Sequence, residues 1–236
     1  MELNSWRAPY SGLAYFFVHP SLWGWAFIGT AISGTMAAFL FIKVIQWTYP
    51  ATNTAWSYYF WHALQSFGWG FLSLILMIAI VFPLILNACF AKGFCSLLKR
   101  AGIEHREEGI TTAFLSSFWV FFRTLKWRIV WPLLLIATIF FLPPLIFPLS
   151  LLAVNHLAVI ESVDLVLSLF GMKANDRVRW LRKRGTECFA FAISGATLSF
   201  LLGLTGVGWI FWIPSIYCGA FVWVQSAIQK EEPKNG

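Results

Sequence analysis

Charged side chains are scarce in this chain of 236 residues. Asp, Glu, Lys and Arg together make up 11%, whereas hydrophobic residues make up 59%, and the mean hydropathy is +0.72. Soluble globular domains carry roughly 25% charged residues, so the composition excludes such a domain and predicts an integral membrane protein. The apolar runs are continuous and show no strict alternation of apolar with polar residues, which favours spanning helices over barrel strands.

Sequence signatures of enzyme chemistry are missing as well. The chain has no glycine-rich phosphate loop, no Gly-x-Ser-x-Gly turn and no His/Cys set at metal-ligand spacing. Its four cysteines lie in apolar surroundings without a Cys-x-x-Cys pair, which predicts small buried side chains and not ligands. We therefore expect no catalytic residue, no metal, no cofactor and no enzymatic activity.

The net charge of +7 indicates topology and not a nucleic-acid partner. In a chain this apolar, basic residues are expected in cytoplasmic loops beside anionic lipid. The first seven residues lack the basic head, apolar core and small-residue site of a cleaved leader, so we expect this segment to be retained.

Two long segments are predicted to cross the membrane, at about residues 21–46 and 67–100. Pro20 and Ser21 precede the first, and the Ser21 side chain can accept a hydrogen bond from the first helical turn. Pro83 is expected to kink the second. Basic residues precede the first segment and follow the second, which places both of these ends in the cytoplasm. Shorter interfacial helices are expected at Pro9–Val18 and at residues 107–127, and the uncharged aromatic loop 48–66 is expected at the outer interface.

Small side chains recur at every fourth position of the first long segment. This stripe predicts close packing against another helix, with lining of a pore as the alternative. Its members are Ala26, Thr30, Gly34 and Ala38.

Two further apolar stretches are interrupted, and each is predicted to form a helical hairpin. The first, at about residues 129–165, has no charged side chain from Ile129 to Ile160 and breaks at Pro143 and Pro144. The predicted arms, about 129–142 and 145–160, are shorter than the ~20 residues of an ordinary span. The second hairpin, at about 186–226, breaks at a glycine-rich turn. Its expected structural or gating residues are Gly206, Gly208 and Pro214. Whether these hairpins cross fully or only insert partway stays open.

Polar residues near the spans are few and allow two interpretations. Glu161 and Asp164 either mark the exit of a helix into the cytoplasm, paired with arginines of segment 173–184, or act as a clamp or gate at the mouth of a permeation path. The basic segment either contacts the cytoplasmic leaflet or forms a vestibule that concentrates anions. The vestibule residues would be Arg177, Arg179 and Arg182.

Several local sequences resemble one known family when their order is considered together. They are Gly12-Leu13, Pro20-Ser21-Leu22, Phe82-Pro83, the acidic Asp164 before a basic segment, Ser194-Gly195-Ala196, Ile213-Pro214 and Cys218-Gly219-Ala220. From about Ser11 to Gln225 the chain resembles the CysZ-like sulfate permeases and the etoposide-induced membrane proteins. The resemblance implies two long spanning helices, two partly penetrating hairpins, a homo-oligomer, and sulfate or a similar oxyanion as permeant.

The chain departs from that family at the start of its first long helix. Where the permeases carry a pair of arginines, this chain has Ser21, Leu22, Trp23 and Gly24. The anion-binding positions implied here are Ser21, Trp23 and Gly24, which offer backbone N–H groups in place of cationic side chains.

The sequence as a whole predicts an all-α integral membrane protein with a single membrane domain over residues 1–236. We expect a multi-pass protein of the bacterial inner membrane with both termini in the cytoplasm. The expected function is a conduit for a small inorganic anion such as sulfate. The alternative is a membrane-organising or scaffold protein that keeps the fold without transport.

Overall fold

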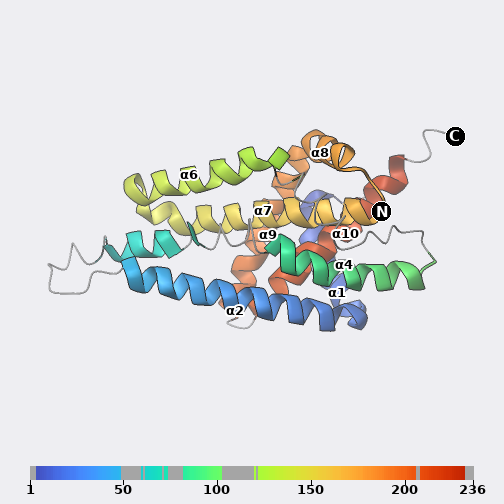
Figure 1. The fold of residues 1–236 in the computed structure, drawn as a ribbon, viewed down its shortest axis with the longest axis horizontal. Helices are drawn as coiled ribbons and strands as arrows, with labels where there is room; N and C mark the ends of the chain where they lie inside the picture. Colours follow the sequence, from blue (N-terminus) through green and yellow to red (C-terminus); the bar gives the residue numbers. More distant parts are fainter. Residues whose placement is uncertain are drawn as a thin grey trace.

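The computed structural model describes residues 4–48, 60, 62–70, 72–73, 82–102, 120, 122–205 and 208–231, and all regular structure in these ranges is helical. Figure 1 shows the helices, most of which lie along one long axis. The α-helices are α1 (Ala8–Val18), α2 (Trp23–Thr48), α4 (Phe82–Arg100), α6 (Leu125–Phe141), α7 (Ile146–Leu169), α8 (Ala174–Lys183), α9 (Gly185–Leu204) and α10 (Trp212–Glu231). Short 3-10 turns occupy Ser5–Arg7, Pro20–Leu22, Pro143–Leu145 and Gly208–Phe211. The all-α fold class is confirmed for these residues.

Three helical stretches among the described residues are long and apolar enough to cross a membrane. They are Pro20–Thr48, Ile146–Leu169 and Gly185–Leu204. The first matches the predicted span at about 21–46. The predicted span at 67–100 is described only in part, because residues 74–81 lie outside the described residues, so that span and its kink at Pro83 stay predictions.

The helix break in the first predicted hairpin lies at Pro143 and Pro144, as the sequence indicates. There α6 ends at Phe141 and a 3-10 turn leads into α7. The second arm is longer than predicted, since α7 continues to Leu169. One interpretation of Glu161 and Asp164 was that they mark where the helix leaves the membrane. Instead, both side chains are buried within α7, and the helix continues past them to Leu169.

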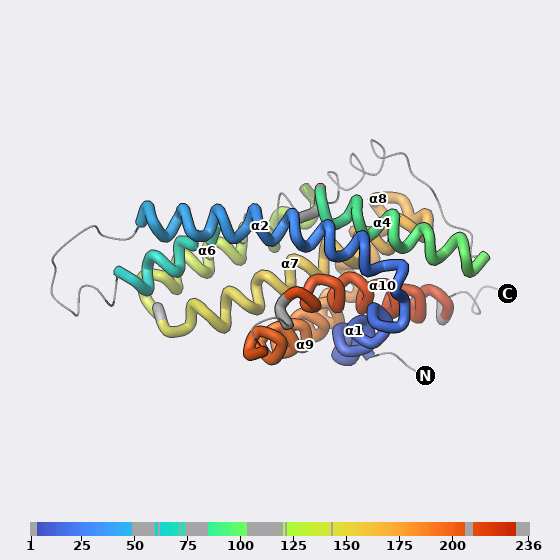
Figure 2. Tube along the Cα trace, turned by 90° about the horizontal axis from the view of Figure 1, so that it is seen from below, coloured from blue at the N-terminus to red at the C-terminus, as the bar shows by residue number. Residues whose placement is uncertain are grey.

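Helix α7 is the central element of the fold. Every residue from Ala153 to Leu167 is buried, and helices α4, α6, α8, α9 and α10 all contact α7. A helix surrounded in this way must be apolar on all sides or must satisfy its polar groups through neighbouring helices. Figure 2 shows α7 between α2 and α9.

Helices α1 and α10 cross at two glycines. A Cβ atom added at Gly12 would lie 2.1 Å from the carbonyl oxygen of Ser215, and one added at Gly219 would lie 2.5 Å from that of Ala8. Only glycine permits this backbone contact. The segment predicted to be interfacial, Pro9–Val18, is therefore a helix that buries one face against the last helix of the chain.

Small residues also face α4 from α2, but only two of them, Ala26 and Thr30, are at predicted positions. The buried residues of α2 are Ala26, Gly29, Thr30, Ser33 and Ala37. Of the predicted stripe, Gly34 is half-buried and Ala38 is exposed. The prediction was wrong in register because a helix turns in 3.6 residues, so an exact four-residue repeat drifts away from the contact face.

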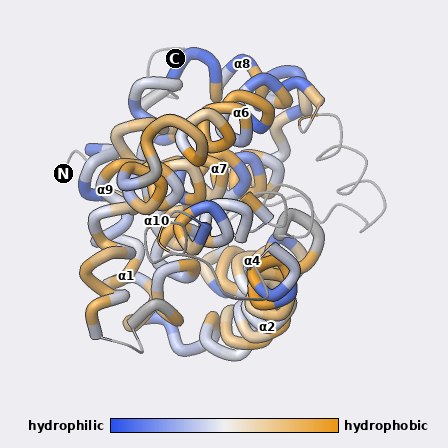
Figure 3. Tube along the Cα trace, turned by 90° about the vertical axis from the view of Figure 1, so that its left-hand side faces the viewer, coloured by the Kyte–Doolittle hydropathy of each residue, from blue (hydrophilic) through white to orange (hydrophobic). Residues whose placement is uncertain are grey.

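The molecule has two chemically different ends. In Figures 1 and 2, α1, α8 and the last turns of α4 and α10 lie toward one end, whereas the Pro143–Leu145 turn and the end of α2 lie toward the other. The first end carries the basic residues of α8 and the Lys99–Arg100 pair. In Figure 3, hydrophobic residues extend along α2, α6 and α9, and hydrophilic residues gather at α8.

Candidate functional site

Two carboxylates one turn apart on α7 form the centre of a buried charge cluster. Glu161 pairs with Arg128 of α6, and both side chains are 5% exposed. The Asp164 carboxylate lies 3.0 Å from the Arg177 guanidinium of α8, and this pair is equally shielded. The four charges sum to zero, as burial in an apolar interior requires, because an unpaired buried charge is strongly destabilising.

Further hydrogen bonds hold the two arginines in place. Arg128 Nε donates to Thr124 Oγ1 at 3.3 Å, and Arg177 donates a second time, to the backbone oxygen of Asp164, at 3.4 Å. The positive charge of Arg128 also interacts electrostatically with the Asp164 carboxylate. The cluster thus fastens α6 and α8 to α7.

A tryptophan–histidine pair joins α6 to α7 beside the charge cluster. Trp131 Nε1 donates to His156 Nδ1 at 2.9 Å. Since Nδ1 accepts this bond, its proton is absent, and the neutral imidazole must carry its hydrogen on Nε2. The rings of Trp127 and Phe189 also meet the imidazole edge-on.

Asn155 joins three helices. Its Nδ2 donates to the carbonyl of Leu151 at 2.8 Å and to Ser199 Oγ at 3.2 Å, while its Oδ1 accepts from Trp212 Nε1 at 2.8 Å. Helix α9 crosses α7 at this point (Figure 1). The absence of a side chain at Gly195 makes room for the Asn155 amide, since a Cβ at Gly195 would lie 2.8 Å from Asn155 Oδ1.

The structure answers the question the sequence left open about Glu161 and Asp164. Pairing of Asp164 with one of the arginines of segment 173–184 is confirmed, and that arginine is Arg177. The partner of Glu161 was missed. Arg128 is the last charge before the uncharged run, and it lies about as far before the proline turn as Glu161 lies after it. In an antiparallel hairpin such residues meet, so the sequence did contain the signal.

The predicted basic vestibule is not one surface. Arg179 and Arg182 are exposed, but Arg177 is buried and paired with Asp164, so it does not face solvent. Amphipathic spacing explains the difference, since Arg177 lies on the face of α8 that also buries Val178, Trp180 and Leu181. The exposed basic residues of α8 and its N-cap are Lys173, Arg179, Arg182 and Lys183.

The predicted anion positions lie together at the start of α2. Ser21 lies within the 3-10 turn Pro20–Leu22, whose N-cap residue is His19, so Ser21 does not hold the predicted cap position. Trp23 Nε1 donates to the carbonyl of Phe16 at 2.9 Å. Gly24 borders open space. The indole donor is therefore engaged within the protein.

The remaining predicted structural residues lie in or beside described helices. Pro20 opens the turn before α2, Pro214 lies in the first turn of α10, and Gly208 belongs to the 3-10 turn Gly208–Phe211, whereas Pro83 lies in the described part of α4, which begins directly after residues outside the described ranges. Gly206, loop residues 49–59 and most of the predicted interfacial helix 107–127 lie outside the described residues.

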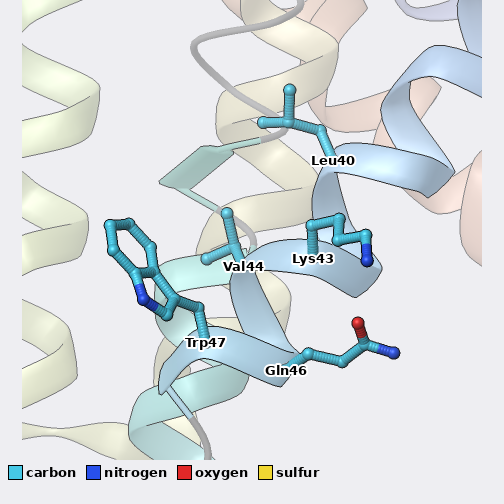
Figure 4. A pocket seen from close by; sticks show the side chains of 5 residues that line it. All are labelled: Leu40, Lys43, Val44, Gln46 and Trp47. Carbon is cyan, nitrogen blue, oxygen red and sulfur yellow. The ribbon is translucent and has the colours of Figure 1, made fainter.

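A shallow cavity of about 400 Å³ lies at the far end of α2, lined by Leu40, Lys43, Val44, Gln46 and Trp47 (Figure 4). Trp47 is 91% exposed. A tryptophan and a lysine at the end of an apolar helix are typical of a membrane–water interface. Among the described residues, no group of three or more His, Cys, Asp or Glu side chains could hold a metal ion.

Comparison of the chain with models of protein families, with curated proteins and with solved structures finds no match. The geometry and the sequence resemblance are therefore the basis for the function proposed next.

Proposed function

We propose that this chain is a conduit for a small inorganic anion such as sulfate. The observation that supports this most is the buried charge cluster of Arg128, Glu161, Asp164 and Arg177, whose two carboxylates lie in the apolar helix α7. Ionisable groups within a membrane domain are costly to bury and commonly mark the route of an ion or substrate.

Helix α8 links this cluster to the surface. Its exposed side carries Arg179 and Arg182, whereas Arg177 on its other side reaches Asp164. An exposed cationic face raises the local concentration of anions. Inside, each guanidinium binds carboxylate oxygens, and a tetrahedral oxyanion offers acceptor oxygens of the same kind. An anion gathered at α8 would have to compete with Glu161 and Asp164 for these guanidinium groups.

The proposed setting is the bacterial inner membrane, with both chain termini in the cytoplasm. It rests on the positive-inside rule, since the basic residues of α8 and the Lys99–Arg100 pair lie toward the end that also holds α1 and the end of α10 (Figure 2). Lipid would cover the bulky exposed side chains of α2 and α6, and association into a homo-oligomer belongs to the same proposal.

Uptake of labelled sulfate into proteoliposomes tests the conduit. Saturable uptake above that of empty vesicles is expected. Arg179→Gln and Arg182→Gln should each lower it about fivefold, since a basic residue near such a surface contributes about 1 kcal/mol. Lys43→Gln, which removes an exposed charge at the far end of α2, is the control and should leave uptake unchanged. Uptake equal to that of empty vesicles from folded protein would exclude sulfate as the permeant.

The second candidate is a scaffold protein that organises the membrane without transport. The engaged Trp23 indole and the buried Arg177 favour it, because both remove contacts that an anion would need. Gly34 and Ala38, which are not in the buried face of α2, are then available to another copy of the chain. Gly34→Leu or Ala38→Leu should dissociate an oligomer in light-scattering measurements while the monomer stays folded.

A further inference from the structure

Three hydroxyl groups in the candidate spans are buried without a hydrogen-bond partner. They belong to Thr30 and Ser33 of α2 and to Ser150 of α7. Other buried hydroxyls donate to a backbone carbonyl one turn back, namely those of Ser73, Thr124, Thr138, Ser162, Ser194 and Ser215. A hydroxyl that forgoes this bond and also lacks water is costly, so such groups in a native protein point to bound water or a ligand.

Two of these hydroxyls face the same neighbour. Thr30 and Ser33, 3% and 0% exposed, lie on the buried face of α2. That face packs on α4, since a Cβ added at Gly29 would lie 3.1 Å from Cβ of Cys89 and 3.2 Å from a methyl group of Leu86. We call the contact of this face of α2 with the Leu86–Cys89 segment of α4 the α2–α4 seam.

Asn87 carries a third unpartnered group in the same segment of α4, on the side that meets Tyr217 of α10. The residue is 7% exposed and lies between Leu86 and Cys89 in the sequence of α4. Its Oδ1 accepts a hydrogen bond from Tyr217 at 2.8 Å, whereas its Nδ2 has no partner. The free group of Asn87 is therefore a donor, and its acceptor is already used.

The seam offers hydrogen-bond donors without a formal charge. The hydroxyls of Thr30 and Ser33 can donate to an oxygen from α2, the amide N–H₂ of Asn87 is a further donor on α4, and the Asn87 amide oxygen already accepts one hydrogen bond, from Tyr217. Small neighbours at Ala26, Gly29 and Ala37 keep side-chain bulk away from the contact. These donors suit water, and they suit an oxyanion better than a metal cation.

We propose that the α2–α4 seam is hydrated and is the route by which the anion passes α2. This inference rests on the proposed conduit and adds the residues that line it. Thr30, Ser33 and Asn87 donate to the passing anion in turn, and water takes its place when it has left. Neutral donors bind an anion less tightly than guanidinium groups do, which favours passage over retention.

Thiol labelling tests hydration of the seam without measuring flux. Ser33→Cys is a conservative change that places a thiol in the seam, and a negatively charged methanethiosulfonate is the probe. The natural Cys188 and Cys218, both buried against other helices, serve as controls within the same sample. Asn175→Cys, exposed on α8, shows that the reagent is active. Peptide mass spectrometry reads each site in folded protein in proteoliposomes.

We expect the thiol introduced by Ser33→Cys to react at least tenfold faster than Cys188 and Cys218, and sulfate to slow this reaction. Reaction no faster than that of the two buried cysteines, with Asn175→Cys fully labelled, would overturn the proposal. Fast labelling that sulfate does not slow would show water but contradict an anion route.

A second pair of variants guards against a folding artefact. Thr30→Val removes one donor at nearly constant volume and should lower sulfate uptake several-fold. Thr138→Val is the matched control, because its hydroxyl donates to the carbonyl of Leu134 and is not free. Equal loss in both variants would contradict a specific role for Thr30.

The experiments separate this inference from the proposed function. Sulfate-protected labelling without any uptake would contradict the conduit and leave the seam as an anion site. Uptake without labelling at the seam would contradict the seam and leave the conduit.

Discussion

Arg128 of α6 and Glu161 of α7 form an ion pair that is almost completely shielded from solvent. The pair lies at the open end of the α6–α7 hairpin, far from the proline turn at Pro143 and Pro144. Of all the described helices, α7 is the one that α6 contacts most extensively. The turn at one end and the ion pair at the other therefore define how α6 lies on the central helix.

Removing Arg128 alone should destabilise the protein more than removing the pair. Arg128→Met leaves the Glu161 carboxylate buried without a partner, and we expect a loss of about 3–5 kcal/mol. The double variant Arg128→Met with Glu161→Met buries two apolar side chains and should recover most of that loss. Chemical denaturation in detergent measures both. A double variant as unstable as the single one would show that the pair is not the cause.

The Asp164–Arg177 pair should control the docking of α8. Arg177→Met removes the positive charge that pairs with the buried Asp164 carboxylate, so we expect α8 to detach from α7 more often. Trypsin cleaves after Arg179, Arg182 and Lys183, and limited proteolysis at these sites should become several-fold faster. Arg182→Gln, on the exposed face of α8, is the control and is compared at Arg179 and Lys183, because the variant itself removes the site after residue 182. Unchanged cleavage in Arg177→Met would mean that apolar contacts alone hold the helix.

The α1–α10 crossing should not tolerate even one methyl group. Gly12→Ala places a Cβ 2.1 Å from a backbone oxygen of α10, and overpacking of this kind costs at least about 1–3 kcal/mol. Gly24→Ala is the control, since nothing lies within 4 Å of its Cβ position and alanine stabilises a helix by up to about 1 kcal/mol relative to glycine. Thermal unfolding should therefore shift in opposite directions in the two variants.

The Trp131–His156 hydrogen bond should stabilise the α6–α7 contact. Trp131→Phe keeps an aromatic ring but leaves His156 Nδ1 without a donor, which costs about 1–3 kcal/mol. Trp127→Phe is the comparison, because Trp127 meets the imidazole only through its ring. Equal stability of the two variants, measured by denaturation, would indicate that the hydrogen bond contributes nothing beyond ring packing.

The sequence predicted the features that depend on residues close together in the chain. Scarcity of charge predicted apolar helices, and Pro143 and Pro144 predicted the helix break, because proline removes a backbone donor wherever it stands. The start of α2 near Pro20 followed for the same reason. At the candidate site, the two acidic residues Glu161 and Asp164 were found in advance, since charged groups beside an apolar run are visible without a structure.

Partners and burial depended on packing between segments far apart in the sequence. Local spacing places Arg177 on the apolar face of α8, with Val178 and Leu181, but could not show that this face meets α7 at Asp164. The small-residue face of α2 was displaced for the same reason, with Ser33 and Ala37 in contact and Gly34 and Ala38 outside.

The sequence by itself determined that the chain forms apolar helices, where proline divides them, and which few residues carry charge into them. Only the tertiary structure decided that Arg128 meets Glu161, that Gly12 touches α10, and that Thr30 and Ser33 lack partners. The physical reason is that helix formation and breaking act within one or two turns, whereas burial and charge pairing are properties of surfaces that exist only after the helices pack.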